Sequence, residues 1–293
     1  MGKTNTLKTY QERMVKVLVY LEQHLEKELT IEELSNVSCF SRFHFQRIFS
    51  AAVGESVYGY LRRLRIQKAA RLIVYSDKSI TEIALSVGYA SSSSFTKAFK
   101  NVVGQNPQAL RNARKLPDLH PVSQQLIHYQ EVKMKHRIEE RKEQTMLFLR
   151  KTGAYEKAAP AAWRQIVEFA HQKGICLKTY PLVGFALDDP TITDEPHLRF
   201  DIGILGLKEP KAEGLLGLQT LAGGPYAVFE HHDHYNCLSD TFAEIYGYYL
   251  PKNDLEPRDE HPFCHYLEGE TPLFSLSTDQ QKSGQKTLIY IPI

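Results

Sequence analysis

The sequence predicts two domains: an all-α domain of two helix-turn-helix units, followed by an α+β domain of two β-α-β-β halves. Three observations support this fold class. The chain has 293 residues, which is long enough for two domains. Helical periodicity dominates residues 8–115, whereas alternating and apolar runs dominate residues 125–293. Each part also repeats itself internally. Residues 116–124, which contain Pro117 and Pro121, form the expected linker.

Charge is distributed unevenly between the two predicted domains. Residues 1–115 contain 18 Lys and Arg and 9 Asp and Glu, a balance of +9. Residues 116–293 contain 18 basic and 25 acidic residues, a balance of −7. A basic domain beside an acidic one indicates two different kinds of partner, and the basic part suits a polyanion such as nucleic acid.

Composition excludes several other classes of protein. The chain is 42% hydrophobic and 24% charged, a globular balance that excludes disorder or a coiled coil for its bulk. It has no apolar run of about 18 residues and no apolar signal region at its start, so neither a membrane span nor secretion is expected. Four cysteines without a CxxC pair indicate reduced thiols and no structural zinc. We therefore expect a cytoplasmic protein.

The first domain contains a duplicated unit. Apolar spacing predicts a helix within residues 8–28, and Thr30 with Glu33 predicts a capping box at the start of the next helix. Residues 41–54 then resemble residues 91–104. The matched positions include Phe45 and Phe95, Phe49 and Phe99, Val53 and Val103, and Gly54 and Gly104. We interpret this repeat as two helix-turn-helix units.

One helix is predicted between the two copies. Residues 58–75 would form a rod about 25 Å long at 1.5 Å per residue. Such a rod would hold the two recognition helices at a fixed separation, and helices about 34 Å apart enter successive major-groove segments on one face of DNA. Because the duplication lies within one chain, we expect a monomer on an asymmetric site, with contact clusters about 10–10.5 bp apart.

These residues resemble the DNA-binding domain of the AraC/XylS family of bacterial transcription regulators, over residues 8–114. The second copy carries the resemblance through Ile80, Ile83, Ala84, Gly88, Tyr89, Phe95, Phe99, Lys100, Gly104, Pro107 and Arg111. The first copy carries it through Leu34, Phe40, Ser41, His44, Gln46, Arg47, Phe49, Gly54, Tyr60, Leu61 and Arg62. The N-terminal position of the domain is a Rob-like arrangement. The resemblance implies sequence-specific binding of double-stranded DNA, with RNA polymerase as a partner and a place at the nucleoid.

The first recognition helix is predicted to read bases. Its buried stripe is expected to consist of Phe45, Ile48 and Phe49. The other face presents four candidates for DNA contact: Arg42, Phe43, Gln46 and Arg47. Arg can bind guanine bidentately, Gln can bind adenine, and an apolar ring can contact a thymine methyl group.

The second recognition helix presents different chemistry. Its candidates for DNA contact are Ser92, Ser93, Thr96 and Lys97. These groups are short or non-directional, so they should read bases more weakly and depend more on phosphate contacts. Four basic residues of the connecting helix are predicted to contact phosphates or to pair with local carboxylates: Arg62, Arg63, Lys68 and Arg71.

The second domain is predicted to contain two similar rounds of strands and a helix. The expected strands lie within residues 125–150 and at 182–187, 198–207, 215–221, 226–231, 263–267 and 287–291. The expected helices are residues 158–173, which Gly174 stops, and residues 238–250, which Pro251 stops. The rounds align at an offset of 80 residues. We interpret this as two β-α-β-β halves, with a cleft at their pseudo-twofold interface.

These residues look like the GyrI-like effector-binding domain, over residues 130–292. The carriers are Thr152, Gly153, Tyr155, Trp163, Asp188, Asp189, Pro190, Arg199, Asp201, Tyr226, Glu230, Tyr235, Phe242, Phe263 and Tyr266. The resemblance implies a small amphipathic, often cationic, effector in an aromatic cleft between the halves. We expect Phe185, Tyr226, Cys264 and Tyr266 to line it.

The sequence departs from the GyrI-like pattern at two positions. The family often places a Glu facing the ligand where this chain has Cys264, so the cleft should prefer neutral or weakly polar aromatic compounds over cations. Asp233 also replaces the usual Gly of a turn before the second helix, and Asp tolerates left-handed geometry better than most residues.

Three groups of residues suggest other chemistry, and we do not expect them to perform it. His231 to His234 would have to converge on a metal, but neighbouring residues of a strand point to opposite faces. The same alternation separates Cys264 from His265, so a thiolate–imidazole pair is not expected. Asp188 and Asp189 precede Pro190, which indicates a turn rather than a carboxylate pair. No cofactor, metal or catalytic residue is therefore expected.

The leading hypothesis is a DNA-binding transcription regulator that responds to a small-molecule effector, and not an enzyme. Two alternatives stay open. One is a GyrI-like hydrolase of small molecules fused to a DNA-binding domain, which the missing carboxylate on the strand 263–266 disfavours. The other is a protein-binding GyrI-like module tethered to DNA. The sequence does not name the effector, the operator or the direction of regulation.

Overall fold

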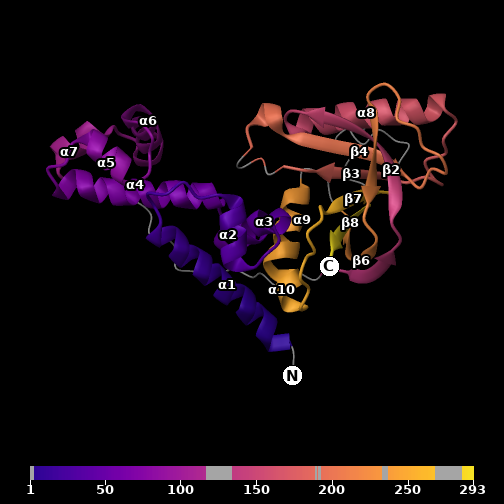
Figure 1. Cartoon of the computed structure of the whole chain (residues 1–293), viewed down its shortest axis with the longest axis horizontal. Helices are drawn as coiled ribbons and strands as arrows, with labels where there is room; N and C mark the ends of the chain where they lie inside the picture. Colours follow the sequence, from indigo (N-terminus) through magenta and orange to yellow (C-terminus); the bar gives the residue numbers. More distant parts are fainter. Residues whose placement is uncertain (1–2, 117–133, 189, 191–192, 233–236, 268–285) are drawn as a thin grey trace. The chain divides into compact units, whose positions relative to one another are not determined.

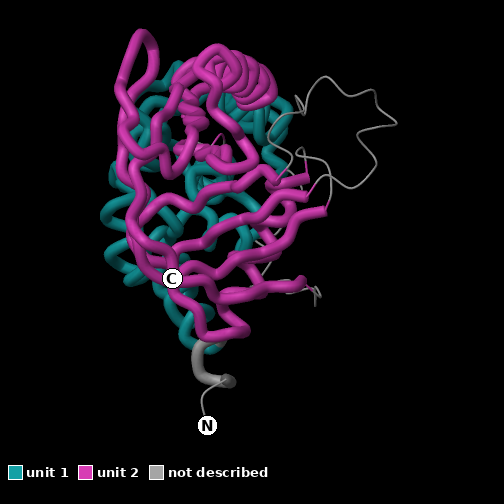
Figure 2. The backbone as a smooth tube through the Cα atoms, turned by 90° about the vertical axis from the view of Figure 1, so that its right-hand side faces the viewer, with its two compact units in different colours: residues 1–129 teal, residues 130–293 magenta. Residues whose placement is uncertain are grey.

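The computed structural model describes residues 3–116, 134–188, 190, 193–232, 237–267 and 286–293 (Figure 1). The chain divides into two compact units, residues 1–129 and 130–293 (Figure 2). The predicted linker, residues 116–124, lies almost wholly outside the described residues, so its bounds stay a prediction.

The first unit is all-helical, as the periodicity predicts (Figure 1). Its helices are α1 Lys3–Gln23, α2 Ile31–Ser38, α3 Arg42–Val53, α4 Val57–Tyr75, α5 Ile80–Ser86, α6 Ser92–Val103 and α7 Pro107–Ala113. Helices α2 and α3 form the first helix-turn-helix, and α5 and α6 form the second. Helix α4 is the continuous rod expected between them, and it contacts helices of both copies.

Matched aromatic pairs anchor both copies. Phe45 and Phe49 of α3 and Phe95 and Phe99 of α6 are all fully buried. The ring centroids of the two phenylalanines are 6.0 Å apart in α3 and 5.4 Å apart in α6. Both recognition helices end at a glycine in the left-handed region, Gly54 and Gly104. The repeat seen in the sequence is therefore a repeat of core packing.

The predicted capping box at Thr30 is only half formed. The Thr30 hydroxyl accepts a hydrogen bond from the Glu33 amide at 3.1 Å. The Glu33 carboxylate accepts from the Tyr20 hydroxyl of α1 instead of bonding back to residue 30. The reciprocal box occurs in the second copy, where Ser79 and Glu82 satisfy each other's backbone amides. A tertiary partner thus replaced the local one in the first copy.

The second unit is built on one eight-stranded antiparallel sheet, in the order β1-β6-β8-β7-β3-β4-β2-β5. The strands are β1 His136–Arg141, β2 Gln144–Thr152, β3 Leu182–Ala186, β4 Arg199–Leu205, β5 Leu216–Leu221, β6 Gly224–His231, β7 Phe263–Tyr266 and β8 Thr287–Pro292. The strands predicted from residue 182 onward are present, and β1 and β2 lie within the predicted range 125–150 or overlap its end. Residues 125–133 of that range lie outside the described residues.

The sheet has the pseudo-twofold organisation that the offset of 80 predicts. Strands β1 and β5 differ by 80 residues at both ends. The central strands β3 and β7 pair with Gly184 opposite Cys264, two residues that are themselves 80 apart, so the axis passes through this pair. Each half also places its first strand on the outer edge of the other half, since β1 pairs with β6 and β5 pairs with β2. The halves are therefore interlocked.

Helices cover one face of this sheet, which we call the helix face. Helix α8, Tyr155–Gln172, packs on β2 and β4 (Figure 1). The second helical run consists of α9 Leu238–Glu244, a π-helical segment Ile245–Tyr249 and α10 Leu250–Lys252. The Tyr249 ring of this run lies 5.0 Å from Phe229 of β6.

The predicted stop at Pro251 is wrong, because the helical run continues through it to Lys252, two residues beyond the predicted end. A proline ring inside an α-helix clashes with the carbonyl group four residues earlier. Here the preceding turn is π-helical, and the Leu250 amide bonds to the Ile245 carbonyl five residues back. The wider turn accommodates the proline.

Candidate functional sites

Helix α3 presents the predicted base-reading residues on the side away from the core. Phe45, Ile48 and Phe49 are buried, as expected. Arg42 is exposed, and the other three candidates are half-buried: Phe43, Gln46 and Arg47. The Arg42 guanidinium carbon lies 4.7 Å from the Phe43 ring centre, a cation–π contact that orders both side chains.

Helix α6 presents the four predicted residues of the second copy. Ser93 and Lys97 are exposed, and Ser92 and Thr96 are half-buried. The Thr96 hydroxyl donates to the Ser92 carbonyl at 2.8 Å, so its hydrogen is already engaged within the helix. Ser91 caps the helix by accepting from the Ser94 amide, and its hydroxyl also contacts Ser93 and Ser94. The start of α6 is therefore a self-bonded cluster of short hydroxyl groups.

The sequence reasoning missed Arg65 of α4. Its guanidinium donates to the Leu25 and Lys27 carbonyls, both at 2.6 Å, and to the Gly88 carbonyl at 3.1 Å. Leu25 and Lys27 lie in the segment between α1 and α2, and Gly88 lies in the turn between α5 and α6 of the second copy. Burial lowers the pKa of Arg65 from its ordinary value. No sequence signal marked this residue, because its partners lie 23 to 40 positions away.

The remaining basic residues of α4 do not share one role. Arg63 pairs with Glu55, with a 3.0 Å bond from its Nε atom, and lies 5.0 Å from the Tyr60 ring. Arg62, Lys68 and Arg71 are exposed.

The four predicted effector-binding residues are divided between the two faces of the sheet. Cys264 and Tyr266 lie on the helix face, since Tyr266 meets Trp163 of α8 at 4.8 Å. Phe185 and Tyr226 lie on the opposite face, where both rings contact Phe263, at 5.6 and 5.5 Å. The sheet therefore does not bring the four residues together.

The opposite face is an aromatic core with arginines laid over it. Phe263 and Tyr290 stack at 4.5 Å and 5° between ring planes. Arg141 lies 4.9 Å from the Tyr290 ring, and Arg258 lies 5.3 Å from the Tyr226 ring. His265 belongs to this face, and burial, aided by the charge of Arg141, lowers its pKa to about 4. It is a neutral core histidine, on the other face from Cys264.

The helix face contains two buried polar atoms without a hydrogen-bond partner among the described residues. They are the indole nitrogen of Trp163 and the hydroxyl of Thr287. Thr287 pairs with Tyr266 across β7 and β8, so its side chain shares that face. A Cβ atom on Gly184 would lie 2.8 Å from the Tyr266 hydroxyl, so Tyr266 folds over the glycine at the pseudo-twofold axis. The sequence singled out Trp163 but could not show that its N–H is unpaired.

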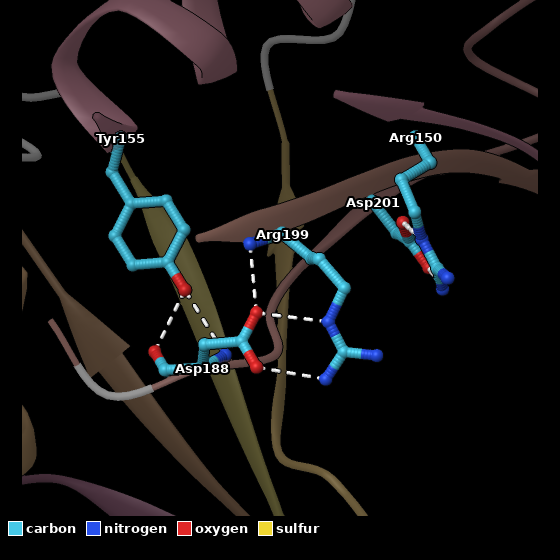
Figure 3. Close-up of polar contacts among 5 residues, drawn as sticks. All are labelled: Arg150, Tyr155, Asp188, Arg199 and Asp201. Carbon is cyan, nitrogen blue, oxygen red and sulfur yellow. Dashed lines mark hydrogen bonds and ion pairs between the residues drawn. The ribbon is translucent and has the colours of Figure 1, made fainter. Parts of the chain in front are cut away.

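Two ion pairs explain several of the carriers of the GyrI-like resemblance (Figure 3). Arg199 binds Asp188 through Nε and a terminal nitrogen, at 2.9 and 2.7 Å. The Tyr155 hydroxyl donates to the Asp188 carbonyl and accepts from the Asp188 amide. Arg150 and the fully buried Asp201 form a second bidentate pair at 2.7 Å.

The Tyr155–Asp188 hydrogen bonds hold the end of β3 against the start of α8, and the Arg199–Asp188 pair holds it against β4. The Arg150–Asp201 pair joins β2 to β4. Burial alone would raise the pKa of Asp188, but the hydrogen bonds and charge of Arg199 outweigh it and hold that pKa below its usual range. The Asp188 carboxylate is thus bound by Arg199 through both of its oxygens. Its sequence neighbour Asp189 lies outside the described residues.

The described residues contain no cluster of His, Cys, Asp or Glu able to hold a metal ion. His231 bonds through Nδ1 to the Thr241 hydroxyl at 2.9 Å. His232, the next residue of the motif, contacts the Glu230 carboxylate through Nε2 at 3.1 Å. Asp233 and His234 lie outside the described part of the chain, as does Tyr235. Within the described residues, no helix has the length and apolarity needed to cross a membrane.

A tandem helix-turn-helix unit followed by a pseudo-twofold α+β unit defines a DNA-binding domain of the AraC type joined to a small-molecule-binding domain. The comparison with family models agrees. The GyrI-like small molecule binding domain matches residues 134–293, and the Helix-turn-helix domain matches residues 34–113. The chain belongs to the GyrI-like family, and it carries an AraC-type helix-turn-helix domain before it.

Individual relatives match about a third of the chain. The chain is 39% identical over 106 residues to YbfP, an uncharacterised transcriptional regulator of Bacillus subtilis, covering 36% of each chain. It is 34% identical over 106 residues to PqrA, a probable transcription factor of Proteus vulgaris, covering 36% of this chain and 87% of PqrA. A solved AraC-type regulator from Chromobacterium violaceum is 25% identical, with a TM-score of 0.35, over 36% of this chain and 96% of that one. The chain thus spans about a third of the length of the Bacillus relative.

Proposed function

We propose that this protein is a sequence-specific transcription regulator whose second unit binds a small-molecule effector, and that it is not an enzyme. The observation that carries the proposal is the pair of recognition helices, α3 and α6, in a unit with a net charge of +9 over residues 1–115. Basic charge supplies affinity for phosphates, and the exposed faces of α3 and α6 supply contacts to bases. In this proposal the protein works in the cytoplasm at the nucleoid, with RNA polymerase as a partner.

A footprint of the full chain tests the DNA part. A site is first selected from random-sequence DNA, and its protected bases are then mapped at fixed salt. We expect one monomer on an asymmetric site, with two contact clusters about 10–10.5 bp apart. A requirement for a palindrome and a dimer would contradict the monomer, and the absence of any sequence preference would contradict the proposal as a whole.

We place the effector on the helix face, around Cys264, Tyr266 and Trp163. An indole N–H can only donate, and buried donors in proteins are almost always paired. A ligand with a hydrogen-bond acceptor would satisfy Trp163, and the Thr287 hydroxyl could bond to a second polar group. Because a cysteine stands at position 264, the effector we propose is a neutral or weakly polar aromatic compound. Phe185 and Tyr226 would support the sheet from its other face.

Calorimetry with a matched pair of neutral and cationic aromatic dyes tests this site. Cys264→Glu should strengthen binding of the cation by about 1–2 kcal/mol, the scale of a partly desolvated charge contact. Trp163→Phe should weaken binding of an acceptor-bearing neutral dye by about 1 kcal/mol. Phe185→Leu is the control on the other face. If Phe185→Leu alone altered binding, the effector would lie on the opposite face of the sheet.

A further inference from the structure

Arg65 lies where three elements of the first unit meet. It belongs to the rod α4, and its guanidinium bonds to the segment that follows α1 and to the turn between α5 and α6. The first of these segments leads into α2 and α3, and the turn leads into α6. One side chain thus joins a backbone segment that leads into the first copy to the turn of the second copy.

The fit around Arg65 is close on the side of the second copy. Gly88 has φ +84°, and a Cβ atom there would lie 2.7 Å from the Leu25 carbonyl oxygen and 2.8 Å from the Arg65 guanidinium carbon. The Arg65 guanidinium also lies 6.0 Å from the ring of Tyr89. The turn of the second copy therefore packs directly against the end of the α1 segment, and only a glycine permits this approach.

We propose that Arg65 is a positioning residue that fixes the separation and rotation of the two recognition helices, and so makes DNA binding dependent on spacing. The inference rests on the proposed DNA-binding function. If α4 were the only connection, each helix-turn-helix copy could rotate relative to α4. A planar guanidinium bonded to three carbonyl oxygens removes that freedom, and a lysine ammonium cannot reproduce this fork. Specific binding then requires one separation between the two contact clusters.

Arg111 provides a matched control, because it makes the same kind of bond without joining the two copies. It donates to the Ile73 carbonyl at 3.5 Å and to the Lys78 carbonyl at 2.6 Å. Both acceptors belong to the end of α4 and the segment before α5, and α7 itself packs on α4. Arg111→Lys therefore removes a comparable fork within the second copy alone.

The experiment measures the affinity of the full-length protein for its selected DNA site and for versions with one or two base pairs inserted between the contact clusters. For the wild type and for Arg111→Lys, we expect each insertion to weaken binding roughly tenfold or more, the scale of one lost base contact. For Arg65→Lys, the penalty should fall to about threefold or less, because the copies can adjust to the new spacing. Affinity for DNA with a single contact cluster should be equal in all three proteins, which shows that both variants are folded.

Arg65→Gln repeats the comparison with a neutral side chain, in case the lysine variant unfolds. An unchanged spacing penalty in either folded Arg65 variant would overturn the inference while leaving the DNA-binding function intact. A wild type that binds specifically but tolerates the insertions would also overturn it. A wild type without specific binding would instead be a failure of the proposed function.

Discussion

The two helix-turn-helix copies share a core and differ in their exposed faces, their turns and their helix caps. Phe45 and Phe49 of the first copy occupy the same buried positions as Phe95 and Phe99 of the second. The exposed sides of α3 and α6 differ, with arginines and a glutamine on α3 and short hydroxyl groups with two lysines, Lys97 and Lys100, on α6. Packing constrains the inward positions of a repeat, whereas its outward positions are free to specialise. Comparison of the copies therefore distinguishes the positions that determine the fold from the positions available for DNA recognition.

The turns differ for a reason that lies outside each copy. The turn of the first copy contains Cys39 with φ 56°, and the turn of the second contains Gly88 with φ 84°. Both residues are left-handed, but Cys39 is exposed, whereas Gly88 packs against the Leu25 carbonyl. The backbone conformation alone tolerates a side chain. The neighbouring segment is what demands glycine in the second copy.

The largest difference between the copies should appear when each turn receives an alanine. Gly88→Ala should destabilise the first unit by roughly 2–5 kcal/mol, the sum of left-handed strain and forced overlap with backbone. Cys39→Ala should change stability by less than about 0.5 kcal/mol, because the site is exposed and its φ is unchanged. Urea unfolding of the full chain, followed by the loss of helical circular dichroism, measures both. Equal effects of the two alanines would show that the turns are equivalent.

Substitutions in the two recognition helices should weaken DNA binding in different ways. Arg47→Ala should cost about 1–3 kcal/mol at the selected site and relax the preference at one base pair. Lys97→Ala should weaken binding evenly across sequences and flatten the dependence of affinity on salt. Titrations of the selected and a scrambled duplex at several salt concentrations distinguish these outcomes. If Arg47→Ala left both affinity and preference intact, α3 would not read bases through that residue.

The smallest difference concerns the caps of α2 and α5. Ser79→Ala and Thr30→Ala should each cost about 1 kcal/mol, but only the Ser79 variant should alter the dependence of stability on pH. The hydrogen bonds to Ser79 lower the pKa of Glu82 in the folded state. A depressed carboxyl pKa stabilises the fold above the unfolded pKa, and this contribution is lost as the pH falls through the folded value. Stability of the wild type should therefore decline in acid, below about pH 4.5, more steeply than that of Ser79→Ala.

Thermal unfolding between pH 3 and 7 measures this effect, with Thr30→Ala as the control. Glu33 makes its side-chain bond to Tyr20 rather than to residue 30, so removing the Thr30 hydroxyl should leave the acid limb unchanged. If the stability of the wild type and of Ser79→Ala fell equally steeply in acid, the capping box would not stabilise the charged form of Glu82 in solution.

The sequence was sufficient for features that depend on local pattern. Helical periodicity and the repeat of glycines and aromatics predicted the helices of the first unit, and the offset of 80 predicted the pseudo-twofold sheet. The faces of β7 were harder to predict. Phe263 of the opposite face and Cys264 and Tyr266 of the helix face are all buried. A strand buried on both sides shows no alternation of polar and apolar residues, so it does not indicate which face binds a ligand.

Other features depended on partners distant in the chain. Nothing near Arg65 in the sequence announces its bonds to Leu25, Lys27 and Gly88, which are set by how α4 crosses the end of α1. Glu33 likewise left its predicted local bond for Tyr20. In both cases tertiary packing, and not the neighbouring sequence, determines the hydrogen-bond partners of the side chain.

Because β1 and β5 each pair with a strand of the other half, the second unit cannot complete its sheet until most of its chain has been synthesised. His136 of β1 pairs with Phe229 of β6, 93 residues later, so β1 has no partner while the intervening chain is being synthesised. At the usual rate of translation this wait is on the order of ten seconds. Neither half can close its own edge, so the sheet is complete only late in synthesis. The first unit, complete long before, can fold while the nascent sheet still waits for its last strands.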